Sequence, residues 1–343
     1  MIRLLANIYG YFVERRNHKF DTGKIPVFTP EVPVISIGNI SAGGTGKTPL
    51  TLLIAKFLLE NGYKPCIISS GYHGKFSGTL LVSNGSKILC EQHEAGDEMY
   101  MLAKNISAPI VINKHKFLAA KNAEALCSPD CIIVDDGFQH RRLHRDLNIV
   151  IIDDKTLARP YPIPRGRLRE KISGIVRADI VCYTVETSEI EQFLSQYPKK
   201  FATAQIRTKT DGFYTLNDTH FANKITEAAI FSGIAHHSKF RNSVRECGIK
   251  IADEIIFGDH HDYSLRDIRR LIDFAKANNT KILITTEKDA VKLAKYSVEF
   301  AKANVETVYL KIASFVSNNS EQFYNSILSL MKDYKNAGKS GTI

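Results

Sequence analysis

Hydrophobic residues in this chain recur in two patterns that alternate along most of its length. Short continuous apolar runs are followed by stretches in which apolar residues lie three and four positions apart. The first pattern is typical of strands buried on both faces, and the second of amphipathic helices. In the first 200 residues the predicted strands are Val32–Ile37, Cys66–Ser69, Ile110–Ile112, Ile132–Val134, Ile149–Ile152 and Ile180–Tyr183. The predicted helices are Lys47–Glu60, Met99–Lys104 and Phe117–Leu126.

The pattern changes near residue 200. Phe201–Arg207 and Phe213–Leu216 alternate between apolar and polar residues and are separated by Thr-Lys-Thr-Asp-Gly, which predicts a β-hairpin. A second series of strand and helix patterns follows and ends with a helix at Gln322–Met331. Such alternation predicts an α/β protein with mostly parallel sheets. We therefore expect two α/β/α domains, residues 1–200 and 226–343, joined by a β-hairpin linker at residues 201–225.

The apolar residues 2–13 form a separate N-terminal feature. Leu4, Ile8 and Phe12 recur every four residues, which places them on one side of a helix. The segment is too short to span a membrane and lacks the small-residue cleavage site of a signal peptide. Two interpretations follow from the sequence: a terminal helix packed on its own domain, and a helix lying in a membrane interface.

The composition is that of an ordinary globular chain. The 343 residues are 44% hydrophobic and 24% charged, which argues against a disordered chain and a multispan membrane protein. The six cysteines include no Cys-x-x-Cys pair, so we expect reduced thiols in a cytosolic protein rather than a disulfide framework.

The net charge of +10 indicates anionic partners, and its distribution is uneven. Residues 1–24 carry a net +3 and residues 141–177 a net +6, and the second segment holds eight of the 17 arginines. The guanidinium group binds phosphate through a fixed fork of donors. The charge alone leaves open a nucleotide, a nucleic acid, a phosphorylated substrate and an anionic membrane.

A glycine-rich segment lies between the first predicted strand and the first predicted helix, where a phosphate-binding loop belongs. Glycines let backbone N–H groups close around phosphate oxygens, and the helix N-terminus adds positive potential. Lys47 is expected to reach the outer phosphates, and the Thr48 hydroxyl to bind Mg²⁺. Ser41 departs from the strict pattern, which begins with glycine, so a turn without a ligand is the alternative. The expected nucleoside-triphosphate site is Ser41, Ala42, Gly43, Gly44, Thr45, Gly46, Lys47 and Thr48.

Two further segments suggest Mg-nucleotide chemistry. An apolar strand ends in Asp135 and Asp136, and an acid in that place of a nucleotide-binding protein holds Mg²⁺. His140 follows at the sheet edge where ligands bind, and it is either a packing residue or part of the site. Residues 165–170, Arg-Gly-Arg-Leu-Arg-Glu, follow three prolines that favour an extended segment. The alternate arginines can share one face and bind phosphate, or belong to a solvated basic loop.

Three other motifs have both structural and functional interpretations. Asp97 precedes a helical stretch, where it can cap the helix. His260 and His261 are adjacent, and because adjacent side chains on an extended segment point apart, an acid–base role suits them better than a metal pair. Thr286-Glu-Lys-Asp289 can be an ordinary helix start with Thr286 as its cap.

Taken together, these motifs resemble those of the tetraacyldisaccharide 4′-kinases, the lipid A 4′-kinase family. The similar segments occur in the family's order and are Pro33–Pro49, Gly96–Glu98, Val134–His140, Gly166–Glu170, Phe257–His260 and Thr286–Lys292. The resemblance implies ATP-dependent phosphorylation of the 4′-hydroxyl of tetraacyldisaccharide 1-phosphate, which gives lipid IVA. It also implies two α/β/α domains joined by a β-hairpin. Its N-terminal helix would dock on the cytoplasmic face of the inner membrane, as in a peripheral protein.

The resemblance also implies roles for individual residues. Asp97 would accept the proton of the sugar hydroxyl, and His260 would support it. Asp135, Asp136 and Glu170 would join Thr48 in the Mg-nucleotide site. The substrate-binding candidates are Asn39, Tyr72, His140, Arg167 and Arg169. The family usually has Ser-Arg-Gly-Tyr where this chain has Ser69-Ser70-Gly71-Tyr72, so Lys75 or an arginine of 165–169 would have to replace that arginine.

Other functions stay open from the sequence. A P-loop kinase or ligase of a small metabolite explains Lys47, Thr48 and Asp135, but not the apolar, basic N-terminus. A nucleic-acid-binding ATPase is suggested by the basic pI alone; no helicase-like motif set supports it, and we expect no nucleic-acid partner. A nucleotide switch would bind nucleotide without substrate-dependent turnover.

Overall fold

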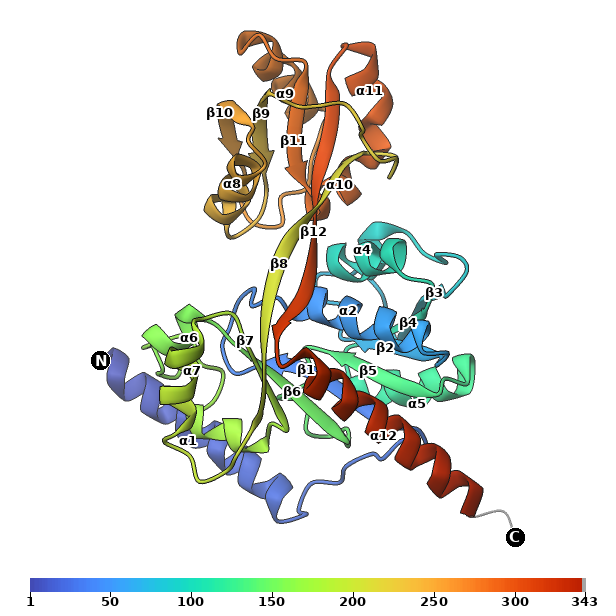
Figure 1. The fold of residues 1–343 in the computed structure, drawn as a ribbon, viewed down its shortest axis with the longest axis vertical. Helices are drawn as coiled ribbons and strands as arrows, with labels where there is room; N and C mark the ends of the chain where they lie inside the picture. The colour runs from blue at the N-terminus through green and yellow to red at the C-terminus, as the bar shows by residue number, and fades with distance from the viewer. Residues whose placement is uncertain (341–343) are drawn as a thin grey trace. The chain divides into compact units, whose positions relative to one another are not determined.

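The computed structural model describes residues 1–340, which form two compact units. Unit 1 comprises Met1–Arg207 and the chain from Ser314 on, and unit 2 comprises Thr208–Ala313. Figure 1 labels the helices and strands of both units. No helix within the described range is both long and apolar enough to cross a membrane.

Unit 1 is an α/β fold with a mostly parallel sheet. Its strands are β1 (Val34–Asn39), β2 (Pro65–Ser69), β3 (Thr79–Asn84), β4 (Pro109–Asn113), β5 (Cys131–Asp135), β6 (Leu147–Ile152), β7 (Ile180–Tyr183) and the first part of β8 (Ala202–Thr215). Its helices are α1 (Ile2–Asp21), α2 (Lys47–Glu60), α3 (Gln92–Ala95), α4 (Asp97–Asn105), α5 (Lys116–Cys127), α6 (Asp154–Ala158), α7 (Thr187–Leu194), α12 (Ser320–Ser340) and the 3₁₀ helix η1 (Ile172–Arg177).

The strand order of unit 1 places the glycine-rich loop beside the two aspartates. The order is β8-β7-β6-β1-β5-β2-β4-β3, with β3 antiparallel to β4 and β1 parallel to both β5 and β6. Ile37 of β1 is in register with Asp135 of β5. Because parallel strands end at the same edge, the loop after β1 and the end of β5 meet there.

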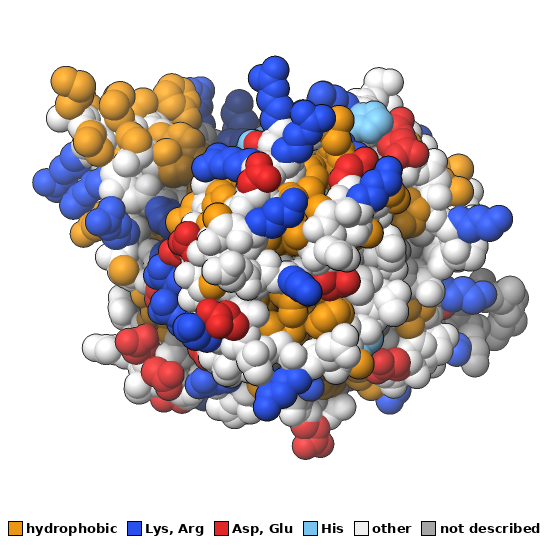
Figure 2. Space-filling view, turned by 90° about the horizontal axis from the view of Figure 1, so that it is seen from above, with side chains coloured by type: hydrophobic (Ala, Val, Ile, Leu, Met, Phe, Trp, Pro, Cys, Tyr) orange, Lys and Arg blue, Asp and Glu red, His pale blue; other side chains and the backbone are white. Residues whose placement is uncertain are grey.

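Helix α1 packs on unit 1 through small residues and leaves large apolar side chains exposed. Ala6 and Gly10 are buried, and a Cβ atom on Gly10 would lie 3.7 Å from Pro162 Cγ. The Tyr9 hydroxyl donates to the carbonyl of Arg169 at 2.9 Å. The exposed large hydrophobic residues of the helix include Ile2, Leu4, Leu5, Ile8, Tyr11 and Phe12. Figure 2, with the N-terminal end of α1 at its left edge, shows hydrophobic side chains grouped there beside lysine and arginine.

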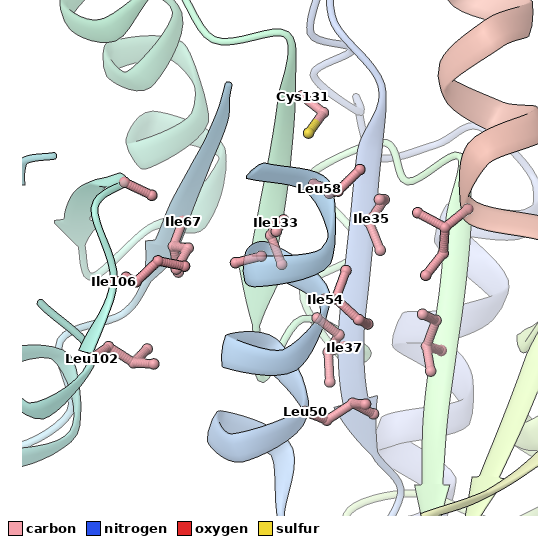
Figure 3. Close-up of a cluster of buried hydrophobic side chains, with 14 of the residues drawn as sticks. Ile35, Ile37, Leu50, Ile54, Leu58, Ile67, Leu102, Ile106, Cys131 and Ile133 are labelled. Carbon is pink, nitrogen blue, oxygen red and sulfur yellow. The ribbon is translucent and has the colours of Figure 1, made fainter. Parts of the chain in front are cut away.

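The core of unit 1 lies between the sheet and the helices on its two faces. Figure 3 shows Ile35 and Ile37 of β1 and Ile133 of β5 on the side where Leu50 and Ile54 of α2 pack. Buried residues of α12 join the same cluster, and they are Phe323, Ile327 and Met331. On the opposite face α5 packs with Ala119, Ala120 and Ala123 against Val34, Cys66, Ile68 and Val134. Alternate residues of each strand therefore enter different cores, which explains the continuous apolar runs.

Unit 2 is a smaller α/β fold with cores of its own. Its strands are β9 (Glu227–Ser232), β10 (Lys250–Ile256), β11 (Ile282–Thr286), the second part of β8 and the first part of β12 (Glu306–Asn318). The strands β10-β9-β11-β12 are neighbours in this order and run parallel. Its helices are α8 (His237–Glu246), α9 (Leu265–Ala277), α10 (Glu287–Leu293), α11 (Ser297–Lys302) and the 3₁₀ helix η2 (Ala294–Tyr296). The α/β class with mostly parallel strands is thus confirmed.

Two details of the chain path differ from the sequence expectation. The turn predicted at residues 208–212 is wrong, because β8 runs unbroken from Ala202 to Thr215. The turn comes later, where the Thr215 N–H donates to the Thr219 carbonyl at 2.9 Å and Asp218 is left-handed (φ 62°). Thr208–Thr210 continue the strand because threonine suits an exposed strand. The second difference is that α12, expected in the 226–343 domain, belongs to unit 1, where its apolar stripe is buried.

Candidate active site

The loop between β1 and α2 has the backbone of a phosphate-binding loop. Gly46 precedes α2 in the left-handed conformation (φ 88°, ψ 19°), and no acidic residue occupies the first turn of the helix. Gly43, Gly44 and Gly46 are exposed, so a ligand can approach the backbone. Asn39 and Thr45 are buried beneath the loop and joined by a hydrogen bond of 2.8 Å. The loop therefore has exposed glycines above the buried side chains of Asn39 and Thr45.

Asp135 and Asp136 lie directly against this loop. Asp135 is buried and accepts hydrogen bonds from the hydroxyls of Thr51 (3.0 Å) and Thr48 (3.4 Å). Asp136 is left-handed (φ 53°), and its carboxylate lies 3.6 Å from Lys47 Nζ. The predicted neighbours Lys47, Thr48, Asp135 and Asp136 are therefore brought together in one cluster.

Burial and charge move the pKa values of this pair apart. Burial raises the pKa of Asp135 to about 6, and the charges of Glu98 and Asp136 add to this shift. Burial also acts to raise the pKa of Asp136, but the positive charges of Lys47, Lys116 and Arg169 outweigh it and lower that pKa to about 2. Asp136 is thus a fixed anion, whereas Asp135 can exchange a proton near neutral pH.

Lys116 completes the cluster and was missed by the sequence analysis. Its Nζ donates to the backbone carbonyls of Asp135 and Asp136, each at 2.6 Å, and the residue is buried. Burial lowers the pKa of Lys116 to about 8. The only sequence signal is a lysine at the start of a helix whose other buried positions are alanines, and that signal is weak.

The arginine segment runs alongside the glycine-rich loop. Ala42 and Arg167 are joined by two hydrogen bonds. The backbone N–H of Ala42 donates to the Arg167 carbonyl at 2.7 Å, and the side-chain Nε of Arg167 donates to the Ala42 carbonyl at 3.2 Å. Arg169 Nη1 donates to both carboxylate oxygens of Asp136, at 2.8 and 2.9 Å. Arg165 instead stacks on Tyr161, with Cζ 3.7 Å from the ring centroid. Arg167 and Arg169 therefore lie beside the glycine-rich loop and Asp136, where they can reach a bound phosphate.

Glu170 is turned toward α1 and η1. Its carboxylate accepts from Arg177 (2.6 Å), Gln139 (3.0 Å) and Asn17 of α1 (3.1 Å), and the residue is 2% exposed. The Gln139 amide also donates to the carbonyl of Asn39 at 2.8 Å. Glu170 is thus connected to the loop through Gln139, and a neighbouring arginine compensates its charge.

His140 is half-buried near these charges. Burial lowers its pKa to about 3, and the positive charge of Lys116 adds to the effect. A cavity of about 180 Å³ lies beside it, lined by α1, the start of α5 and the loop after β5. His140 is therefore a neutral donor and acceptor near neutral pH.

Asp97 is the first residue of α4 and is 7% exposed. Gln92 Nε2 donates to its carboxylate at 2.6 Å. The preceding Gly96 is left-handed in φ (79°), and a Cβ atom there would lie 2.6 Å from the carbonyl oxygen of Tyr72. Glycine is required at this position because the loop that carries Tyr72 packs against it. The Tyr72 side chain itself is exposed, and its ring lies tilted against that of His73, with the centroids 4.0 Å apart.

His260 belongs to unit 2, where it follows β10 in a left-handed conformation (φ 60°). Its Nε2 lies 3.1 Å from Lys288 Nζ. His261 turns elsewhere, with its Nε2 3.3 Å from Asp267 and its ring stacked on Phe257. The adjacent histidines thus have different partners, but His260 lies in a turn and not on the extended segment that was predicted. Thr286 caps α10 by accepting from the Asp289 N–H at 3.2 Å.

A glycine-rich loop between β1 and α2, with aspartates at the end of the neighbouring strand β5, defines the class of this chain as a P-loop phosphotransferase. The model of the tetraacyldisaccharide-1-P 4′-kinase family matches residues 1–332, and the chain belongs to that family. Both its sequence and its fold are those of a lipid A 4′-kinase, an enzyme that acts on a glycolipid.

Individual relatives agree with the family match. The tetraacyldisaccharide 4′-kinase of Chlorobaculum parvum is 33% identical, covering 97% of this chain and 95% of its own. That of Aquifex aeolicus is 35% identical, covering 86% of this chain and 90% of its own. A crystal structure of LpxK from Aquifex aeolicus in complex with ATP has a TM-score of 0.78 and 30% identity, covering 95% of this chain and 97% of that one.

Proposed function

We propose that this chain binds Mg·ATP at the loop Ser41–Thr48 and transfers the γ-phosphate to the 4′-hydroxyl of tetraacyldisaccharide 1-phosphate. The observation that carries the proposal is the contact of Lys47 and Thr48 with the aspartates at the end of β5. ATP is the named ligand of the related Aquifex aeolicus structure, which supports the same donor here. Phosphoryl transfer needs alignment and charge neutralisation more than covalent chemistry, and this cluster supplies both.

The donor set at this edge suits Mg²⁺. Thr48 offers a hydroxyl oxygen and Asp135 a carboxylate, which are the hard oxygen ligands that Mg²⁺ prefers. Asp136 and Glu170 would add negative charge to the Mg-nucleotide site, Asp136 beside Lys47 and Glu170 through Gln139. When bound, Mg²⁺ supplies charge neutralisation at the phosphate oxygens.

Asp97 is the proposed base. Its carboxylate is buried and oriented by Gln92, so it can hold the 4′-hydroxyl and accept its proton. We propose that His260 supports this step. As Asp97 takes the hydroxyl proton, the 4′-oxygen bonds to the γ-phosphorus of ATP and the bond from that phosphorus to the β,γ-bridging oxygen breaks, so that ADP is the leaving group.

We propose that the substrate contacts polar and charged side chains around the glycine-rich loop. His140 is neutral and can donate or accept toward a sugar, and Tyr72 exposes its ring. Arg167 and Arg169 add positive charge beside Asp136 and suit a phosphorylated substrate. Asn39 lies under the loop with its side-chain oxygen unpaired by any described protein atom.

We propose that residues 2–13 dock the enzyme, as a peripheral protein, on the cytoplasmic face of the inner membrane. The large apolar side chains of α1 point away from its packed face at Ala6 and Gly10. Arg3, Arg15, Arg16 and Lys19 lie on the same helix and can attract anionic lipid headgroups. A glycolipid substrate is reached from such a surface without leaving the membrane.

Two variants test the chemistry in one assay of ATP-dependent phosphorylation of tetraacyldisaccharide 1-phosphate. Asp97→Asn should lower kcat by about 100-fold or more while ATP binding survives, since it removes only the base. Lys47→Met should weaken ATP binding itself. Lys56→Met, an exposed lysine of the same helix, is the control. Near-normal turnover by Asp97→Asn would exclude Asp97 as the base.

A further inference from the structure

We propose that Lys288 is a positioning residue that fixes the tautomer of His260, with the ring proton on Nδ1. The inference rests on the proposed role of His260 in the reaction. It gives a function to the segment Thr286–Asp289, which otherwise looks like an ordinary helix start.

The argument begins at the ring of His260. Lys288 Nζ lies 3.1 Å from His260 Nε2. An ammonium group has three N–H donors and no acceptor, so Nε2 must be the acceptor of this hydrogen bond. A neutral imidazole has one donor and one acceptor nitrogen. The contact with Lys288 therefore selects the form in which Nδ1 carries the proton.

The backbone beneath the ring is held by the next residue of the same helix. The His260 N–H donates to the Gly233 carbonyl at 3.0 Å, and the Gly233 N–H donates to Asp289 at 3.1 Å. Asp289 is fully buried and also accepts from the Tyr263 hydroxyl at 3.0 Å. The loop packs tightly here, since a Cβ atom on Gly233 would lie 3.0 Å from the Asp289 carboxylate.

The consecutive residues Lys288 and Asp289 therefore have different roles. Asp289 fixes the loop backbone that carries His260, and Lys288 fixes the rotation and the proton of its ring. Both project from the first turn of α10, which Thr286 holds at its start by accepting from the Asp289 N–H. In the other tautomer, Nδ1 would be a hydrogen-bond acceptor instead of a donor.

The test combines a spectroscopic and a kinetic measurement on the full chain. In protein labelled with ¹⁵N-histidine, two-bond ¹H–¹⁵N correlation spectra report the tautomer of His260, assigned by its loss in His260→Gln. Wild type should show the Nδ1–H form, and Lys288→Met should shift toward the Nε2–H form. Lys288→Met should also lower kcat by about tenfold or more, with KM for ATP changed by less than about twofold.

Two further variants separate positioning from folding and from charge. Lys288→Arg keeps N–H donors without an acceptor and should restore the tautomer and part of kcat. Lys302→Met removes an exposed lysine of unit 2 and should change neither. An unchanged tautomer in Lys288→Met would overturn the proposal, and so would a raised KM for ATP with the tautomer intact, which would make Lys288 an anion-binding residue. Full activity of His260→Gln would instead refute the role of His260, while the spectra would still decide what Lys288 does.

Discussion

Asp135 and Asp136 are neighbours in sequence but differ in what they can do. Asp136 stays ionised because Lys47, Lys116 and Arg169 surround it, whereas burial leaves Asp135 with a pKa of about 6. Of the two aspartates, only Asp135 therefore gains or loses a proton near neutral pH. A Mg²⁺ ion held by Asp135, as proposed above, would compete with the proton for the carboxylate.

This competition predicts a pH dependence of the metal-assisted part of nucleotide binding. The folded pKa of Asp135 is raised, so the protonated form predominates below about pH 6 and must lose its proton before Mg²⁺ binds. The gain in ATP affinity from Mg²⁺ should therefore fall by up to about tenfold for each pH unit below 6. Titration calorimetry of ATP with Mg²⁺ and with EDTA between about pH 5 and 8 measures it.

The two aspartates supply their own control for this measurement. Asp135→Asn should remove the slope, whereas Asp136→Asn should keep it, because Asp136 titrates near pH 2. A slope that persists in Asp135→Asn would assign the titration to another group.

At the scale of elements, α1 is the helix whose packing is least like that of the others. Its small residues face the protein, and its large apolar residues are exposed. Tyr9 and Asn17 also connect it to Arg169 and Glu170, which are neighbours of the candidate site. The helix is thus held by a few specific bonds while its apolar side stays uncovered by the described chain.

Replacing two exposed residues of this helix should weaken membrane binding without unfolding the protein. Leu4→Ser with Phe12→Ser removes apolar area at positions that are 63% and 61% exposed. Burial of each side chain in lipid is worth about 1.5–3 kcal/mol, so the double variant should bind liposomes at least about tenfold more weakly. Co-sedimentation with vesicles containing anionic lipid measures the change.

The control for α1 is an exposed apolar residue of unit 2. Val298→Ser, at 57% exposure, should leave vesicle binding unchanged. If the α1 double variant binds vesicles like the wild type, the exposed side of α1 is not the docking surface.

Sequence patterns predicted the strands well where both faces of a strand are buried. They predicted residues and elements poorly where contacts with distant parts of the chain determine the structure. The runs that became β1, β2 and β5 were recognised because both of their faces are buried. The edge strand β3 was missed; three of its six residues are only partly buried, so it is less enclosed than β1, β2 and β5. The glycine-rich loop and Asp135 were found because their chemistry is local. Lys116 was not, because its partners are backbone carbonyls of another element.

At the scale of the molecule, each unit has buried clusters of its own. Leu58 lies in the core of unit 1 and Leu271 in that of unit 2, and both are fully buried. The loop, the two aspartates and Asp97 all belong to unit 1, so its integrity alone should decide nucleotide binding.

A core substitution in each unit tests this division. Leu271→Ala should cost unit 2 about 2–5 kcal/mol, because it leaves a cavity in a closed core. Hydrogen exchange should quicken in unit 2, while the Kd for ATP should stay within about twofold at a temperature where unit 1 is folded. Leu58→Ala should do the reverse and weaken ATP binding. Equal loss of ATP binding in both variants would mean that the units unfold as one.

The packing of the C-terminal helix α12 in unit 1 has a consequence for folding during synthesis. Phe323, Ile327 and Met331 fill the core beside α2, yet they are synthesised after the whole of unit 2. On the ribosome, the first 207 residues therefore emerge without the helix that covers part of their sheet. Unit 2 has all its strands once β12 has emerged. The nucleotide-binding unit begins synthesis first and is completed last, and until then its nascent sheet exposes apolar surface that chaperones recognise.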